Sequence, residues 1–179
     1  VLELGILPRL KSASIGGMEP KVWSLLLKSG QLRGLKALTV EYVEDEDIEL
    51  IEDFAACEAL SGLEKLDLDG ISMPPGGMRA LLASPHFTKL KHLALCDLSL
   101  DDLKLLVESR WAENLESLTL TSAGDFTSKH AALLAGAERL AGLRSLSLPV
   151  EENATLQILA KSRVLKLRNL EFQVCECDD

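Results

Sequence analysis

The chain has few aromatic residues and no long apolar run. Phe, Trp and Tyr make up 4 % of its 179 residues, although 47 % of the residues are hydrophobic. Aliphatic side chains must therefore fill the core. No segment holds the roughly 18 consecutive apolar residues of a transmembrane helix. The first residues lack both an initiator Met and a signal-peptide pattern, so we expect the natural protein to be longer.

The four cysteines lack the paired spacing of a secreted disulfide framework. Cys57 falls in a predicted helix, Cys96 near the end of a predicted strand, and Cys175 and Cys177 near the last residue. We therefore expect reduced thiols in a cytoplasmic protein. Because no second Cys or His pair stands near Cys175 and Cys177, we interpret them as part of a terminal strand and tail rather than a metal site.

The charge is negative, and no basic stripe balances it. The net charge is −9. Residues 41–53 hold eight acids and no base, whereas the remainder of the chain holds 20 acids and 19 bases and is therefore nearly neutral. Binding to nucleic acid depends on Lys and Arg neutralising phosphates, and binding to an anionic membrane surface also needs bases. We therefore expect neither partner.

Catalytic and cofactor motifs are missing as well. His86, His92 and His130 fall in different predicted elements. His92 and Cys96 would lie roughly 13 Å apart along a strand, whereas base activation needs about 3 Å. No phosphate-binding glycine loop or zinc-ligand spacing is present. The sequence thus predicts no enzyme activity, cofactor or metal in this chain.

What the chain does contain is a repeat. The pattern Leu-x-x-[Leu/Ala]-x-[Leu/Val/Ile/Phe] returns seven times, at intervals of 24 to 28 residues. Its opening residues are Leu10, Leu35, Leu63, Leu90, Leu115, Leu143 and Leu167. The second and third apolar columns are two residues apart, so they share one face of a short strand. A fourth apolar column lies three residues before each opening. A period of this kind is typical of a solenoid.

Segments with helical spacing lie between the predicted strands. Asp101–Glu108 begins with acids and continues with apolar residues at helical intervals, and similar segments surround Ile48, Leu81 and Leu133. Good helix stop signals follow at Gly30, Gly62, Ser84-Pro85 and Gly136. Neither element can bury its apolar face alone, so successive units must stack, with strands on one side and helices on the other. Because a helix is wider than a strand (about 10 Å against about 4.8 Å), the strands should lie on the inside of a curve.

These columns resemble the leucine-rich repeat family, over about residues 7–174. The repeat length is similar to that of the helical ribonuclease-inhibitor-like subclass, and residues 81–93 resemble repeats of bacterial members. The resemblance implies an α/β solenoid of about seven repeats, with a curved parallel sheet on the concave face and helices on the convex face. It would form a single domain over residues 1–179. The family's usual Asn or Cys is replaced by residues such as Ile71 and Leu98, so water or backbone turns must satisfy the loops in place of an amide ladder.

The predicted concave face carries small, hydroxylic and acidic side chains. The candidate protein-binding residues are Glu41, Tyr42, Lys65, Asp67, Asp69, His92, Cys96, Thr119, Thr121 and Ser147. We name Glu41, Asp67 and Asp69 the acidic edge; with the acids of residues 44–53 they are suited to steering a basic partner. Two alternatives stay open. A solvated sheet face needs polar residues anyway, and acids before Ile48 favour a helix N-terminus.

The function that these patterns favour is recognition of another protein, which we expect to be basic, without catalysis. The chain would be an adaptor or recognition module of a larger protein. A first alternative is an acidic inhibitor or immunity-type protein that covers the active site of a basic enzyme. A second is a regulatory domain of an enzyme, such as an effector ubiquitin ligase, with its catalytic part outside this chain. The oligomeric state is not predicted.

Overall fold

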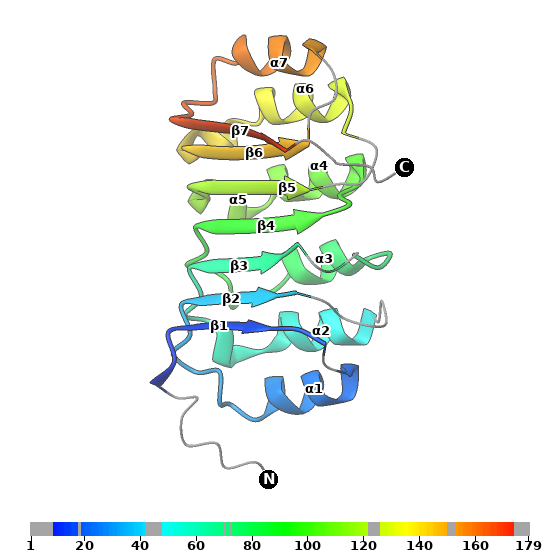
Figure 1. Cartoon of the computed structure of the whole chain (residues 1–179), viewed down its shortest axis with the longest axis vertical. Helices are drawn as coiled ribbons and strands as arrows, with labels where there is room; N and C mark the ends of the chain where they lie inside the picture. Colours follow the sequence, from blue (N-terminus) through cyan, green and yellow to red (C-terminus); the bar gives the residue numbers. More distant parts are fainter. Residues whose placement is uncertain are drawn as a thin grey trace.

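The computed structural model describes residues 9–17, 19–41, 48–69, 71, 73–121, 126–149 and 153–173. In this part of the chain seven strands form one sheet in which every neighbouring pair is parallel. The strands are β1 (Ser12–Ile15), β2 (Ala37–Val40), β3 (Lys65–Leu68), β4 (His92–Cys96), β5 (Ser117–Thr121), β6 (Ser145–Pro149) and β7 (Asn169–Gln173). They follow one another in chain order, from β1 at the bottom of Figure 1 to β7 near the top.

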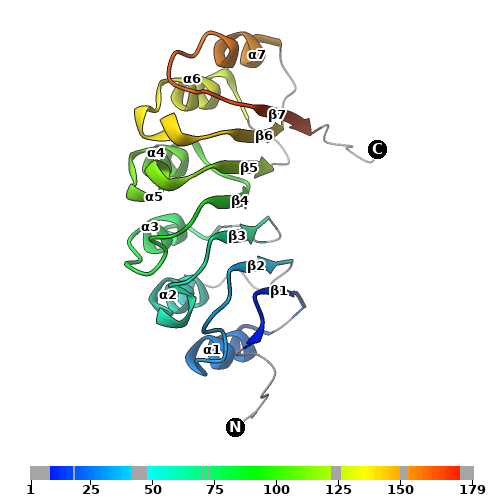
Figure 2. The ribbon, with the colours of Figure 1, turned by 90° about the vertical axis from the view of Figure 1, so that its left-hand side faces the viewer.

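Helical segments connect successive strands. The longer ones are α1 (Pro20–Lys28), α2 (Ile48–Ala56), α3 (Gly77–Leu82), α4 (Leu100–Glu108), α6 (Ser128–Gly136) and α7 (Asn153–Ala160). Shorter ones are α5 (Arg110–Asn114) and the 3₁₀ helices η2 (Glu58–Leu60) and η3 (Glu138–Gly142). Figure 2 shows the helices on one side of the sheet, with the stack bowed so that the strands lie on its inner side. The predicted α/β class is confirmed. We name the sheet face turned away from the helices the open face.

The strand register places the predicted apolar columns at equal depth. Pairing aligns Ala13, Leu38, Leu66, Leu93, Leu118, Leu146 and Leu170 in one row. From Leu38 to Leu146 these side chains are at most 2 % exposed, and the opening leucines from Leu35 to Leu143 are at most 1 % exposed. All of them belong to one continuous core. Side chains two apart on a strand point to the same face, which explains why the spacing of the repeat was sufficient to predict this row.

Backbone hydrogen bonds repeat with the same period. The carbonyl of Lys11 accepts the N–H groups of Lys36 and Ala37 at 2.8 and 3.0 Å. The carbonyls of Lys36, Glu64, Lys91, Glu116 and Arg144 each accept two N–H groups of the following unit in the same way. One backbone carbonyl thus binds the two N–H groups at the start of each following strand, so these N–H groups have hydrogen-bond partners where parallel pairing begins.

Side chains of one unit also satisfy helix ends of the unit before it. The Cys57 thiol donates to the carbonyl of Leu27 at 3.3 Å, and the Ser84 hydroxyl donates to the carbonyl of Ala55. The hydroxyl of Ser162 donates to the carbonyl of Ala135 at 2.6 Å. The last carbonyls of a helix have no partner within the helix, so these contacts join neighbouring units. Cys57 itself lies between α2, which ends at Ala56, and η2, which begins at Glu58, so the prediction that it lies within a helix is wrong.

The aromatic residues concentrate in the helix layer. Trp23, Phe54, Phe87 and Trp111, from four successive units, contact one another with ring-centroid distances of 6.4, 6.1 and 5.3 Å. Each is at most 5 % exposed. Tilted and edge-on arrangements of this kind are favourable for aromatic rings. Four side chains thus form a continuous aromatic seam, in which both tryptophans of the chain are buried.

The helix stop signals were only partly right. Gly30 directly follows the turn at the end of α1 and has a φ of +71°, a conformation that favours glycine. Gly62, however, follows η2, because α2 already ends at Ala56. Gly136 is the last residue of α6 rather than the residue after it. The glycine pattern therefore located the helix ends within several residues, without distinguishing α-helix from a following 3₁₀ turn.

Truncation of one column residue tests the stacked core. Leu118→Ala removes a side chain that is 0 % exposed and should lower the free energy of unfolding by roughly 3 kcal/mol. The matched control is Leu25→Ala on α1, where the side chain is 71 % exposed; it should change stability by less than about 0.5 kcal/mol. Urea denaturation followed by circular dichroism measures both. Equal effects of the two variants would contradict the assigned core.

Candidate protein-binding surface

The sheet register brings the candidate residues of the open face into rows. Lys65 pairs with His92, so these side chains lie next to each other on β3 and β4. Asp67, Ala94, Thr119 and Ser147 form a second row across β3 to β6. Most of the predicted binding residues are therefore neighbours on one face. Tyr42, and the acids of residues 44–47, lie outside the described residues.

The exposure of these residues divides the face in two. Lys65 and His92 are exposed, and Asp67 and Thr119 are half-buried. Ser147 is only 6 % exposed, and its hydroxyl accepts a hydrogen bond from the side-chain amide of Gln173 at 3.3 Å. It therefore offers little surface to a partner. The accessible part of the predicted site lies over β3 to β5.

Hydroxyl groups hold the acidic edge from both sides. Ser14 on β1 donates its hydroxyl hydrogen bond to Glu41 at 2.6 Å. The hydroxyl of Thr121 on β5 donates a hydrogen bond to the carboxylate of Asp69. The backbone N–H of Asp69 in turn donates to the carboxylate of Asp67 at 3.3 Å, which brings these two residues together. Two carboxylates of the edge are thus fixed by side chains from strands far apart in the sequence.

Asp69 lies close to two other carboxylates. Partial loss of solvent, followed by the negative charges of Asp67 and Asp97, raises the pKa of Asp69. Lys65 forms an ion pair with Asp67 at 3.6 Å, an exposed contact that stabilises little. Negative charge is therefore concentrated where β3 and β4 end.

Asp97 is a residue that the sequence analysis missed. It directly follows β4 and has a φ of +49°, which Asp adopts more readily than most residues. Its charge acts on both Asp69 and Cys96. The available signal was its place just past a predicted strand, one residue further along the repeat than Asp69.

Cys96 donates a hydrogen bond instead of facing a partner freely. It is half-buried, and its thiol donates to the carbonyl of Ile71 at 3.0 Å. Burial first, and then the charges of Asp97 and Asp69, raise the pKa of Cys96 to about 11. The thiol is therefore protonated at neutral pH and a poor nucleophile. It also satisfies a loop carbonyl that we expected water or a backbone turn to satisfy.

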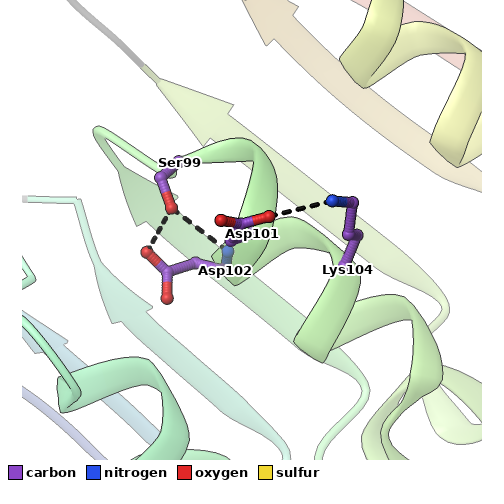
Figure 3. A network of polar contacts seen from close by, with 4 residues as sticks. All are labelled: Ser99, Asp101, Asp102 and Lys104. Atoms are coloured by element: carbon purple, nitrogen blue, oxygen red, sulfur yellow. Dashed lines mark hydrogen bonds and ion pairs between the residues drawn. The ribbon is translucent and has the colours of Figure 1, made fainter.

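Acids outside the edge have a local structural role, which α4 illustrates in Figure 3. The hydroxyl of Ser99 accepts the backbone N–H of Asp102 at 3.1 Å and donates to its carboxylate at 2.6 Å. Lys104 forms an ion pair with Asp101 at 2.9 Å. These contacts satisfy the helix N-terminus and place negative charge where its dipole favours it.

The described residues hold no metal-binding cluster and no membrane-spanning helix. Within the described ranges, no three His, Cys, Asp or Glu side chains come together to hold a metal ion. None of the helices described is long and apolar enough to cross a membrane. No family model matches the chain, and no curated protein matches it in sequence. A function must therefore be argued from the geometry of the surface.

The raised pKa of Asp69 predicts a pH-dependent effect of Asp69→Asn. A raised pKa means that the folded protein disfavours the ionised carboxylate, so ionisation of Asp69 costs stability at pH above that pKa. The variant should therefore have a higher Tm than the wild type at pH 7. The difference should shrink as pH falls through the pKa of Asp69, because the wild-type residue then becomes neutral too. Thermal denaturation across pH 3 to 8 measures this.

Asp101→Asn is the matched control for that experiment. The hydrogen bond from Lys104 lowers the pKa of Asp101, so its ionised form is favoured in the folded state. This variant should have a slightly lower Tm than the wild type at pH 7. The assignment of strain to Asp69 is wrong if both substitutions shift Tm in the same direction.

The raised pKa of Cys96 predicts slow alkylation. In a background with Cys57, Cys175 and Cys177 replaced by Ser, the rate with iodoacetamide at pH 8 should be about 100-fold below that of a thiol with the ordinary pKa of 9.0. The rate should rise tenfold per pH unit up to about pH 11. Intact-protein mass measures the reaction, and the urea-unfolded protein is the control. A rate that levels off below pH 9 would exclude this assignment.

Proposed function

We propose that this chain is a leucine-rich repeat module that binds a basic partner protein through the open face over β3 to β5 and the acidic edge. The chain would bind the partner without catalysing a reaction on it. The observation that supports the proposal is the position of Asp69: partial loss of solvent first, and then the charges of Asp67 and Asp97, raise the pKa of Asp69. A Lys or Arg of a partner placed there would exchange repulsion for attraction.

Preorganisation of the acids supports this function. Ser14 and Thr121 hold Glu41 and Asp69 by hydrogen bonds, and the buried leucine rows fix the strands behind them. Side chains that are already ordered lose little conformational entropy on binding. A partner would therefore meet a surface whose charges are in place before contact.

The chemistry of the surface suggests binding by steering rather than by apolar anchors. The described open-face residues over β3 to β5 are Lys65, Asp67, His92, Ala94, Cys96, Ser117, Thr119 and Thr121. Interfaces held by hot spots are typically rich in Trp, Tyr and Arg, which this set lacks. Charge complementarity raises association rates and selects partners of the opposite sign. Exposed charges are screened by salt, so such binding should be salt-sensitive.

The family assignment and the location belong to the same proposal. The parallel strands in chain order, the helices on one side and the aligned leucine rows support a leucine-rich repeat solenoid that forms one domain over residues 1–179. Cys57 and Cys96 are free thiols. Free, half-buried or buried thiols support a reducing compartment, and hence a cytoplasmic protein.

Charge reversal tests the proposed surface. The triple variant Glu41→Lys, Asp67→Lys and Asp69→Lys should retain at least about tenfold less of a basic partner than the wild type, because like charges now meet. Immobilised protein, incubated with lysate of the native host, captures the partner at about 0.05 M salt and releases it at about 0.5 M. Mass spectrometry identifies and quantifies the captured protein.

The control is a second triple variant with the same change in net charge. Glu58→Lys, Glu108→Lys and Glu138→Lys alter exposed acids on η2, α4 and η3, in the helix layer. They should leave capture unchanged. If both triple variants capture the partner in the same amount as the wild type, the acidic edge is not its binding site.

A further inference from the structure

A side-chain hydrogen bond closes the helix layer at three of the five junctions between the described units, from the unit of α1 to that of α7. The acceptor is the carbonyl eight residues before the opening leucine that follows the helix. The donor is a thiol or hydroxyl one or two residues after the α-helix of the next unit. The pairs are Cys57 with Leu27, Ser84 with Ala55, and Ser162 with Ala135.

Both junctions of the unit that contains β4, α4 and α5 lack this bond. At the first junction Ser109 holds the donor position, but its hydroxyl donates to the carbonyl of Leu106 in its own unit at 2.6 Å. At the second junction the donor position holds Ala137, whose side chain has no donor. Among the described residues, the acceptor carbonyls of these junctions, those of Leu82 and Val107, therefore receive no hydrogen bond from the next unit.

Ala137 differs from Cys57 in its side chain and hardly in its backbone. φ and ψ are −75° and 98° at Cys57, and −77° and 93° at Ala137. The backbone N–H of each donates to the carbonyl three residues earlier at 3.2 Å. Ala137 also stands as far along the chain from Val107 as Cys57 stands from Leu27, which is 30 residues. At this junction the bond is therefore missing because of one side chain.

The additional helix α5 explains the other junction. Ser109 is both the residue after α4 and the residue before α5, so its hydroxyl satisfies the end of α4 instead of reaching the preceding unit. A groove of about 800 Å³ opens there, between residues 82–85 and the residues Glu108, Arg110 and Trp111. Both walls belong to the middle of the stack, with α3 on one side and α6 on the other (Figure 2).

Contacts of other kinds remain at these two junctions. The rings of Phe87 and Trp111 lie 5.3 Å apart across the first, and Glu113 pairs with Arg139 across the second. Apolar packing is non-directional, and an exposed ion pair contributes little. A hydrogen bond, in contrast, fixes its two groups within a narrow range of distance and angle. Without one, packed helices can slide over each other in a shear motion.

We propose that the unit of β4, α4 and α5 is a hinge unit, at which the helix layer shears and the curvature of the sheet changes. The units before it, joined by Cys57 and Ser84, would move as one block, and the units joined by Ser162 as another. The sheet is continuous through the hinge unit, so its strands would tilt relative to one another without separating.

The hinge unit lies behind part of the proposed binding surface. Asp69 belongs to the unit before it, and Asp97 directly follows β4 of the hinge unit itself. Thr121, whose hydroxyl donates to Asp69, belongs to the unit after it. Shear would therefore change the separation of these groups and let the surface adjust to a partner. This consequence rests on the proposed function, whereas the hinge does not.

Restoring the missing donor tests the hinge. Ala137→Ser supplies a hydroxyl for the carbonyl of Val107 and should raise Tm by about 2 to 4 °C, the shift for one net hydrogen bond in a chain of this size. In the wild type, amide hydrogens in the last turn of α4 should exchange faster than those in the last turn of α2. Ala137→Ser should slow this exchange in α4 about fivefold. Ala137→Cys, which carries the thiol that Cys57 uses, is the second variant in case the first does not fold.

Two matched variants serve as controls. Cys57→Ala removes the donor from a closed junction and should speed amide exchange in the last turn of α1 about fivefold. Ala141→Ser makes the same substitution as Ala137→Ser at an exposed position of η3. It should change neither Tm nor exchange, because its hydroxyl has no carbonyl of the preceding unit to bind.

Spin labels measure the bending directly. Glu58→Cys and Lys161→Cys, at exposed positions of the two blocks, carry the labels in a chain whose native cysteines are replaced by Ser. The distribution of distances between the labels should be narrower when Ala137→Ser is added. No partner enters these measurements, so failure of the hinge and failure of the proposed function are distinguishable. Equal widths, equal Tm shifts in Ala137→Ser and Ala141→Ser, or exchange in α4 as slow as in α2 would overturn the proposal.

Discussion

The whole structure depends on equal-depth stacking of leucine side chains. No unit of one strand and one helix can bury its own apolar face, so each obtains its core from the unit on either side. Parallel pairing holds Leu38 to Leu146 in one row, and a slip of one residue would turn every one of them toward the open face. Register is therefore fixed by burial, and every surface position is fixed with it.

This constraint sorts the charges of the molecule onto the two ends of the strands. Near the ends of β3 and β4, the charges of Asp67 and Asp97 act on Asp69 and, after the larger effect of burial, raise its pKa. At the beginnings of the strands, bases and acids alternate from Lys36 to Arg144, and Lys36–Glu64 and Lys91–Glu116 form ion pairs. The same repeat thus produces an acidic group at one end of the strands and paired charges of both signs at the other.

The sequence was sufficient for whatever recurs with the repeat. The leucine rows, the α/β class and the strands all follow from side-chain spacing, which is a local property of the chain. The path of the loops is not local in this sense. Hence the hydrogen bonds from Cys57, Ser84 and Ser162 to the preceding unit were missed, as were the closure of Ser147 by Gln173 and the position of Asp97. Each depends on how one connection passes over its neighbour.

The aromatic seam has a consequence for how this protein can be observed. The two tryptophans of the chain, Trp23 and Trp111, stand at the two ends of the seam, and neither lies in the units of β6 and β7. Intrinsic emission on excitation of tryptophan therefore reports the N-terminal part of the stack, while far-ultraviolet dichroism averages over all units. In a molecule whose units touch only their neighbours, coincidence or separation of these two signals would distinguish all-or-none melting from fraying that begins at the C-terminal end.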